Sequence, residues 1–270
     1  MKIAFIGTGV MGEAMISALL RHGIMAPDAI RAYDINPNRL AVIEKRYSIS
    51  TTSSVDSALS EYDVIVLAIK PQSLAGVFEA VRGLLREGQV VLSVVAGAKI
   101  SAIRKGLVHD SVVRVMPNAP AQFGEGMSVW IASNTVSQAH KEVVQTILES
   151  MGKQILVSDE KYIDMATAIS GSGPAYIFLI MESLIDAAVH IGLPRDLASE
   201  LVLQTITGAA HMTRESGKHP AELKNLVTSP GGTTAAALLS LEEGRIRAIL
   251  TQAIIAAYEK AQLLGGEKSK

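Results

Sequence analysis

The sequence of 270 residues contains no cysteine. This absence excludes disulfide bonds, thiolate metal ligands and cysteine nucleophiles, and it fits a reducing compartment. Blocks of like charge are absent too, because 25 basic and 26 acidic residues are spread along the chain and leave a formal net charge of −1. We therefore expect neither a nucleic-acid surface nor a polybasic membrane anchor.

Targeting and metal-binding patterns are also missing. The short apolar run at residues 3–6 leads directly into glycines, whereas a signal peptide needs a longer apolar region. The six histidines are scattered without a HxxxH pair, which argues against a metal site. These absences predict a cytoplasmic protein without a metal centre.

Apolar residues make up 49% of the chain, and the mean hydropathy of +0.30 is high for a soluble monomer. The most apolar stretch, Tyr176–Leu193, contains Glu182, Asp186 and His190, so we expect a buried helix and no membrane span. Excess apolar surface is most simply covered by a second subunit. The composition therefore predicts an obligate homo-oligomer.

The first part of the chain alternates between strand and helix patterns. Such alternation predicts an α/β fold with a doubly wound, mostly parallel sheet of the Rossmann kind. The predicted strands are residues 2–6, 30–34, 64–69, 90–95, 111–116, 126–131 and 154–157. The predicted helices are residues 13–22 and 37–46, one beginning at residue 101, and residues 137–151.

Strand patterns stop after about residue 159, and helical periodicity or helix-rich composition continues to the end. Gly-Pro, Leu-Pro and Ser-Pro pairs separate the segments. The predicted helices are residues 161–169, 174–191, 195–216, 220–227, 233–243 and 245–264. We therefore expect a dinucleotide-binding domain at 1–160 and an all-helical domain at 161–270.

A glycine-rich motif, Gly7-Thr8-Gly9-Val10-Met11-Gly12, follows the first strand and opens the first helix. In a dinucleotide-binding turn, the first glycine permits the tight bend and the second lets the main chain approach the pyrophosphate. The third packs the helix against the strand. Since the second strand ends in Asp34, the whole βαβ context is present. We predict that Ile6–Gly12 binds NADH or NADPH.

The preference between the two cofactors stays open at this stage. Asp34 could accept both ribose hydroxyls of NADH and would repel a 2′-phosphate. Asn36 and Arg39 lie just beyond it and could instead receive that phosphate. We include all three among the predicted cofactor contacts.

Two further segments should lie at the same edge of the sheet, because ligands of open α/β sheets bind beyond the carboxyl ends of the strands. Ala68-Ile69-Lys70-Pro71 ends one apolar strand and Ala96-Gly97 follows the next. Pro71 fixes the direction of the chain and Gly97 permits close approach. Lys70 is a possible catalytic acid, although a lysine at a strand end is more often structural.

Two serine- and glycine-rich segments stand out in the helical half. Ser170–Pro174 is interpreted as a helix start, with Ser172 or Gly173 as the cap and Pro174 in the first turn. Thr228–Thr234 leads into an Ala/Leu-rich helix, so unpaired N–H groups and several hydroxyls should converge there. Such a nest suits a small carboxylate without an arginine.

Five segments together resemble one known family, Δ1-pyrroline-5-carboxylate reductase. The similarity runs over nearly the whole chain and in register. It is carried by Ile6–Gly12, Ala68–Gln72, Met116–Pro120, Ser170–Tyr176 and Val227–Thr234.

The resemblance implies reduction of the cyclic imine pyrroline-5-carboxylate to L-proline by NAD(P)H, the last step of proline biosynthesis. It also implies a helical dimerisation domain that completes the site of a partner subunit. The substrate carboxylate would be held by Ser229, Gly231, Gly232, Thr233 and Thr234. Thr234 would lie near the ring nitrogen as a catalytic residue, with help from Ser172.

Two alternative functions share part of this pattern. A β-hydroxyacid dehydrogenase shares the N-terminal pattern but needs a lysine in the helix after Gly173, where none occurs before Lys218. A dinucleotide-sensing regulator without turnover would keep the first glycine loop but would leave the 229–234 loop unexplained.

Overall fold

The computed structural model describes residues 1–266, which belong to two compact units. Unit 1 comprises Met1–Ser172 together with the chain from Ala257 onward, and unit 2 comprises Gly173–Ala256.

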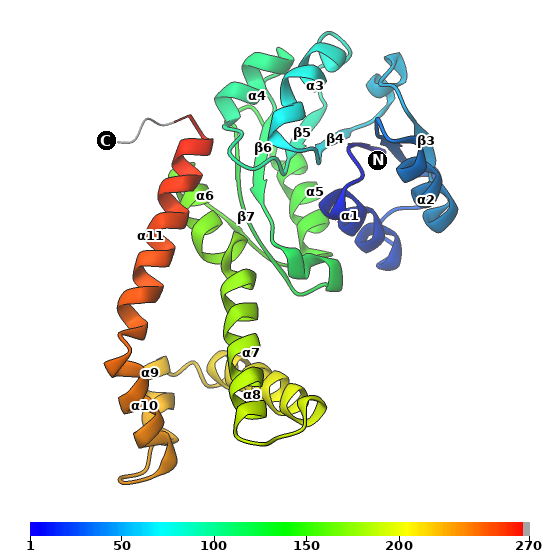
Figure 1. The fold of residues 1–270 in the computed structure, drawn as a ribbon. Helices are drawn as coiled ribbons and strands as arrows, with labels where there is room; N and C mark the ends of the chain where they lie inside the picture. Colours follow the sequence, from blue (N-terminus) through cyan, green and yellow to red (C-terminus); the bar gives the residue numbers. More distant parts are fainter. Residues whose placement is uncertain (267–270) are drawn as a thin grey trace. The chain divides into compact units, whose positions relative to one another are not determined.

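Unit 1 is built around an eight-stranded sheet in the order β3-β2-β1-β4-β5-β6-β7-β8 (Figure 1). All neighbouring pairs are parallel except β6 and β7, which are antiparallel. The predicted doubly wound, mostly parallel sheet is therefore confirmed. The strands are β1 (Ile3–Ile6), β2 (Ile30–Tyr33), β3 (Ser50–Thr52), β4 (Val64–Leu67), β5 (Val90–Ser93), β6 (Val112–Met116), β7 (Gly126–Ala132) and β8 (Gly152–Leu156).

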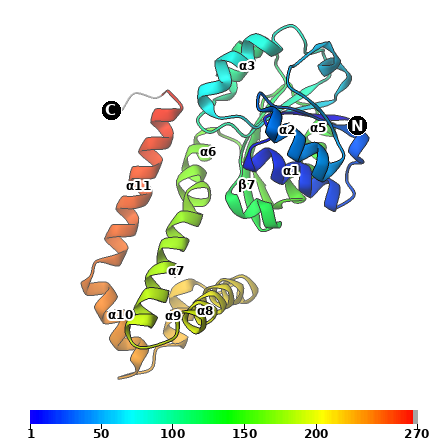
Figure 2. The ribbon, with the colours of Figure 1, turned by 45° about the vertical axis from the view of Figure 1, so that its right-hand side comes forward.

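Helices cover both faces of this sheet, because alternate strand residues feed two separate cores. Ile3 and Phe5 of β1 pack into one core, and Ala4 and Ile6 pack into the other. The first core includes residues of α1 (Val10–Arg21), α2 (Pro37–Tyr47) and α5 (Gln138–Glu149), and the second includes residues of α3 (Leu74–Val81) and α4 (Ile100–Leu107). Figure 2 shows α3 on the opposite side of the sheet from α1 and α2.

Two elements of unit 1 were missed from the sequence. β3 is a short edge strand of polar residues, Ser-Thr-Thr, without the apolar alternation that marks a half-buried strand. Helix α3 follows Pro71–Ser73, a 3₁₀ turn, and buries only Val81. Helix α3 does carry apolar residues at helical spacing, since Leu74, Val77 and Phe78 pack against the second core and Val81 lies in it. The sequence therefore contained a signal for α3 that the prediction overlooked.

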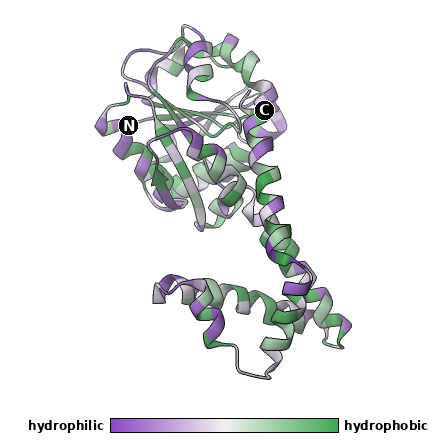
Figure 3. Cartoon of the chain, turned by 90° about the vertical axis from the view of Figure 1, so that its left-hand side faces the viewer, coloured by the Kyte–Doolittle hydropathy of each residue, from purple (hydrophilic) through white to green (hydrophobic). Residues whose placement is uncertain are grey.

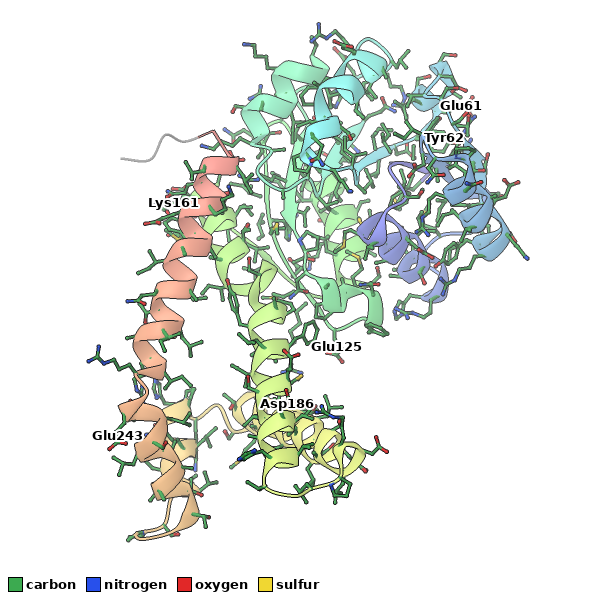
Figure 4. The ribbon with its side chains drawn as sticks, in the orientation of Figure 1. Glu61, Tyr62, Glu125, Lys161, Asp186 and Glu243 are labelled. Atoms are coloured by element: carbon green, nitrogen blue, oxygen red, sulfur yellow. The ribbon has the colours of Figure 1, made fainter. Side chains whose placement is uncertain are left out.

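The structure corrects the predicted helix start at Ser170–Pro174. Helix α6 (Lys161–Ala166) passes through a π-helical turn, Thr167–Gly171, into α7 (Gly173–His190), so the helix is continuous from Lys161 to His190. Figure 4 labels Lys161 at its beginning and Asp186 near its end. Ser172 and Gly173 therefore do not cap a new helix, and the two glycines lie in or beside a π turn.

Unit 2 consists of helices, as predicted. They are α7, α8 (Arg195–Ser216), α9 (Pro220–Leu226), α10 (Thr233–Glu243) and the first part of α11 (Ile246–Leu264). The expectation of a buried apolar helix is wrong for the single chain, since α7 has no buried residue. Phe178 and Leu179 are 60% and 63% exposed, and Figure 3 shows hydrophobic residues along much of the length of these helices.

The helix from Lys161 to His190 is long and apolar enough to cross a membrane by length and composition alone. Its apolar residues are spread along a segment that is hardly buried within the chain. A helix at a subunit interface would be equally apolar and equally exposed in the single chain, because the partner subunit covers its side chains.

Candidate functional site

The glycine loop between β1 and α1 is shaped by tight main-chain packing. Gly7 has φ +97°, and a Cβ atom there would lie 2.5 Å from the Ala68 carbonyl oxygen. A Cβ atom at Gly12 would lie 2.5 Å from the Gly7 carbonyl oxygen. Both positions therefore exclude any side chain, as the sequence predicted for the turn and for the helix–strand contact.

Gly9 differs from both of its neighbouring glycines. It has φ −60°, and a Cβ atom there would meet nothing within 4 Å. The packing of unit 1 therefore does not require glycine at this position. Gly9 is also the N-cap of α1, and no side chain caps that helix end. An open surface beside the N-terminus of a helix suits a bound pyrophosphate.

Asp34 is tied directly to this loop. Its Oδ2 atom accepts hydrogen bonds of 2.8 Å from both the main-chain N–H and the hydroxyl of Thr8, and its Oδ1 atom accepts one of 3.0 Å from the Asn36 N–H. Burial alone would raise the pKa of Asp34, but these hydrogen bonds outweigh it and lower the pKa below the ordinary value. Asp34 is consequently a fixed carboxylate at the end of β2.

The other two residues predicted near the cofactor ribose are already engaged within the chain. The Asn36 side chain caps α2 by accepting from the N–H groups of Asn38 and Arg39. Arg39 donates from Nε to the Thr8 carbonyl oxygen at 2.7 Å and forms an ion pair with Glu13. Sequence reasoning missed Glu13, although an acidic residue in the first turn of a helix was visible.

The remaining predicted cofactor segments lie at the same edge of the sheet, because β1, β4, β5 and β6 run parallel. Ala68–Pro71 directly follows β4, and the Ala68 N–H donates to the Ile6 carbonyl oxygen at 2.9 Å. Ala96 and Gly97 follow β5. A Cβ atom at Gly97 would lie 2.8 Å from the Leu264 carbonyl oxygen, so this glycine also makes room for the end of α11.

Asn118, which follows β6, joins this edge to the π turn. Its side-chain amide donates to the Ser170 carbonyl oxygen at 3.0 Å and accepts from the Met127 N–H at 2.8 Å. Met116 packs against Gly171, where a Cβ atom would lie 2.8 Å from the methionine methyl group. The segment Thr167–Ser172 is therefore held at the strand ends that carry the predicted cofactor loops. Sequence reasoning left Asn118 out of the site, although it occupies a strand end like the residues it included.

A buried ion pair anchors the same helix to the sheet. The Arg114 guanidinium on β6 is 3% exposed and contacts Asp164 of α6 at 2.7 Å and Glu160 at 2.9 Å. Glu160 also accepts from the Ile100 N–H at 2.9 Å. Because a buried guanidinium requires a carboxylate partner, these contacts fix the orientation of α6.

The predicted substrate loop lies in unit 2, before α10. Gly231 has φ +69°, and a Cβ atom at Gly232 would lie 2.4 Å from the Ser229 hydroxyl oxygen. Gly232 is the N-cap of α10 and has no side-chain cap. The Thr228 hydroxyl, by contrast, donates to the Lys224 carbonyl oxygen of the preceding helix at 2.7 Å. The loop thus combines an uncapped helix end with the side chains of Ser229, Thr233 and Thr234.

Comparisons with known proteins assign the chain to a family. A family model for pyrroline-5-carboxylate reductase dimerisation matches residues 160–264, and one for coenzyme F420-dependent NADP oxidoreductases matches residues 2–97. The pyrroline-5-carboxylate reductase of Arabidopsis thaliana is 39% identical over 264 residues, covering 97% of this chain and 95% of the relative. The chain belongs to the pyrroline-5-carboxylate reductase family.

Solved structures agree with this family assignment. The pyrroline-5-carboxylate reductase of Coxiella burnetii has a TM-score of 0.89 and 36% identity, with 99% of both chains covered. The Plasmodium falciparum pyrroline carboxylate reductase with NADP bound also has a TM-score of 0.89, with 34% identity and 98% of both chains covered. The chain is therefore an NAD(P)H-dependent oxidoreductase that acts on a C=N bond, in the last step of proline biosynthesis. Neither the hydroxyacid dehydrogenase nor the non-catalytic regulator is favoured by these matches.

The family match also explains the exposed apolar helices. Residues 160–264, which match the dimerisation model, include α7, α8 and α10, where Phe178, Leu201 and Leu239 are among the exposed large apolar side chains. Burial of such side chains between subunits removes apolar surface from water and stabilises an oligomer. This supports the predicted homo-oligomer.

Proposed function

We propose that residues 1–160 bind NAD(P)H and that residues 161–270 form the substrate-binding and dimerisation domain. In the first domain, the glycine loop with Ile6, Val10 and Met11 would hold the pyrophosphate. Ala68–Pro71, Ala96 and Gly97 would line the nicotinamide end. The observation that carries this assignment is Gly9, which the packing of the protein does not require but a bound pyrophosphate would.

We further propose that Ser229 and Gly231–Thr234 bind the carboxylate of pyrroline-5-carboxylate. An uncapped helix N-terminus presents N–H groups and a favourable dipole to an anion, and the hydroxyls of Ser229 and Thr233 add donors. Thr234 would hydrogen-bond the ring nitrogen, and Ser172 would assist from the segment next to the π turn. Pyrroline-5-carboxylate is the substrate proposed for this loop.

The chemistry needs little beyond positioning. A protonated cyclic imine is already electrophilic, so no buried acid has to protonate a developing alkoxide. Bound NAD(P)H supplies the hydride that is transferred to C5 of the imine. The residues of the chain orient the imine, hold its carboxylate and exclude water from the ring. Lys70 is exposed at its strand end, and this mechanism assigns it no proton transfer.

Replacement of Thr234 tests the substrate assignment. Thr234→Ala should lower kcat/KM for the imine by a factor on the order of 10–100, the scale of one or two lost hydrogen bonds. Thr228→Ala is the matched control, because its hydroxyl is bonded to Lys224 on the preceding helix. Equal kinetics for Thr234→Ala and the wild type would refute the role of Thr234.

We also propose that the protein works in the cytoplasm as a homodimer or larger homo-oligomer, without a nucleic-acid or membrane partner. The near-zero net charge and the dimerisation match support this view. The apolar face of the Lys161–His190 helix would then lie between subunits. Ultracentrifugation of detergent-free protein tests this, and a protein that stays in the membrane fraction would contradict it.

A further inference from the structure

The end of β2 presents a negative charge that the structure holds in place. Asp34 receives three hydrogen bonds, two from Thr8 and one from Asn36, yet it is only partly buried. Each carboxylate oxygen has two lone pairs, so Oδ2 is fully used by Thr8 and Oδ1 can accept one further bond. The Thr8 contacts also place it directly against the glycine loop.

Arg39, whose positive charge acts on Asp34, already has a carboxylate partner. Arg39 is bonded to the Thr8 carbonyl oxygen and paired with Glu13, whose carboxylate is 18% exposed. Glu13 is held in turn by Arg46 at 2.9 Å and by the Tyr47 hydroxyl at 3.0 Å. Burial opposes ionisation of Glu13, but hydrogen bonds from Arg39 and Tyr47 and the charges of Arg39 and Arg46 lower its pKa overall. Arg39 is thus paired with Glu13, which stays ionised at neutral pH.

From this arrangement we infer that the chain prefers NADH to NADPH, and that Asp34 determines the preference. The inference rests on the proposed binding of the cofactor by the glycine loop. The free position on Oδ1 of Asp34 would accept a ribose hydroxyl of NADH. A 2′-phosphate would instead meet a fixed carboxylate, and any contact with Arg39 would compete with the bonds of its guanidinium to Glu13 and Thr8.

The Thr8 hydroxyl allows the orientation of Asp34 to be changed without removing its charge. It donates to the same Oδ2 atom as the Thr8 N–H, at the same distance of 2.8 Å. Thr8→Val keeps the shape of the side chain and removes this donor, so Asp34 becomes less firmly oriented. We expect the preference for NADH to weaken while the charge repulsion on NADPH persists.

The test compares the Kd of NADH with that of NADPH by fluorescence titration, and kcat/KM for the two cofactors at one fixed concentration of pyrroline-5-carboxylate. The wild type should favour NADH by a factor on the order of 10 or more, and Asp34→Ser should lower that ratio at least about tenfold. Asp34→Asn keeps an acceptor for Thr8 and removes the charge, so it should shift the ratio in the same direction even if Asp34→Ser folds poorly. Asp28→Ser is the matched control, because Asp28 precedes β2 at the opposite edge of the sheet.

Glu13→Gln tests whether the ion pair with Glu13 keeps Arg39 away from the cofactor. With the ion pair weakened, Arg39 becomes available to a phosphate, so the use of NADPH should rise relative to NADH. A wild type that favours NADPH, or an unchanged ratio in Asp34→Asn, overturns the inference. The proposed cofactor loop fails separately, if Gly9→Val binds both NADH and NADPH as tightly as the wild type.

Discussion

The side-chain amide of Asn118 donates a 3.0 Å hydrogen bond to the main-chain carbonyl of Ser170, a residue 52 positions further along the chain. The same side chain accepts from the Met127 N–H, so a single residue joins the end of β6, the start of β7 and the π turn. A π turn interrupts the regular helical hydrogen bonds, and such turns are frequent at functional sites. Asn118 is therefore a positioning residue for the segment that carries Ser172.

Removal of the Asn118 side chain should disturb the segment that carries Ser172 without weakening the binding of NAD(P)H to the same extent. Asn118→Ala leaves the Ser170 carbonyl and the Met127 N–H without their partner, at a cost of about 1–3 kcal/mol in unfolding free energy. We expect kcat to fall more than the affinity for NAD(P)H, measured by steady-state kinetics and by fluorescence titration. Gln122→Ala removes an exposed amide from the same segment and serves as the control. Equal losses in the two variants would contradict the role of Asn118.

The glycines of the first loop should respond differently to substitution. Gly9→Val should keep its unfolding free energy within about 1 kcal/mol of the wild type, because a Cβ atom there meets nothing within 4 Å. It should nevertheless lose NAD(P)H binding. Gly7→Ala places a Cβ atom 2.5 Å from the Ala68 carbonyl oxygen and should lower the thermal midpoint clearly. Calorimetry of both variants, with and without cofactor, makes this comparison.

The buried ion pair between Arg114 and Asp164 should be important for stability. Asp164→Asn leaves a buried guanidinium with only Glu160, so we expect a loss of roughly 3 kcal/mol in denaturant unfolding. Asp110→Asn breaks an exposed pair with Arg104 and should cost less than about 1 kcal/mol. If the two variants unfold at the same denaturant concentration, Arg114 does not anchor α6 as described.

Tyr33 gives a prediction at alkaline pH. The side chain lies in the core next to β1, and within the described residues its buried hydroxyl has no hydrogen-bond partner. Burial raises its pKa from 10.0 to about 12, with negative charge at Asp56 and Glu61 adding to the shift; Figure 4 labels Glu61 beside Tyr62. The folded protein therefore favours the neutral form of the Tyr33 hydroxyl more strongly than the unfolded chain does. Below pH 10 the hydroxyl is neutral in both states, and as the pH rises toward 12 the unfolded chain ionises first, so the free energy of unfolding falls.

The variant Tyr33→Phe should therefore be as stable as the wild type at neutral pH, because no hydrogen bond is lost. Between pH 10 and 12 the wild type should lose stability faster than the variant. Thermal melts across this range provide the measurement. If the thermal midpoints of the two proteins fall in parallel over this pH range, burial does not raise the pKa of Tyr33 as described.

Much of this fold could be predicted because its strongest patterns are local. The apolar runs at β4 and β5 indicated strands covered on both faces, and β1, the glycine loop and Asp34 together indicated a dinucleotide-binding unit. β3 could not be predicted in the same way, since Ser50–Thr52 is short, polar and at the sheet edge. Its position depends on pairing with β2, which is a tertiary interaction.

The π turn and the exposure of α7 had non-local causes. Pro174 and its neighbouring glycines have the composition of a helix start, but Asn118 bonds the Ser170 carbonyl and Met116 fills the space at Gly171. The apolar residues of α7 predicted burial that the single chain does not show. Such a pattern carries no information on whether the covering surface belongs to the same chain. The ion pair of Arg39 with Glu13 was likewise hidden, because it joins two helices.

The measurement closest to the central claim is the oxidation of NADH and NADPH by the purified protein on addition of pyrroline-5-carboxylate, with proline quantified as the product. We expect one proline to form for each cofactor molecule oxidised, and no such turnover in Gly9→Val. A folded, oligomeric wild-type protein that binds the cofactor but forms no proline would contradict it.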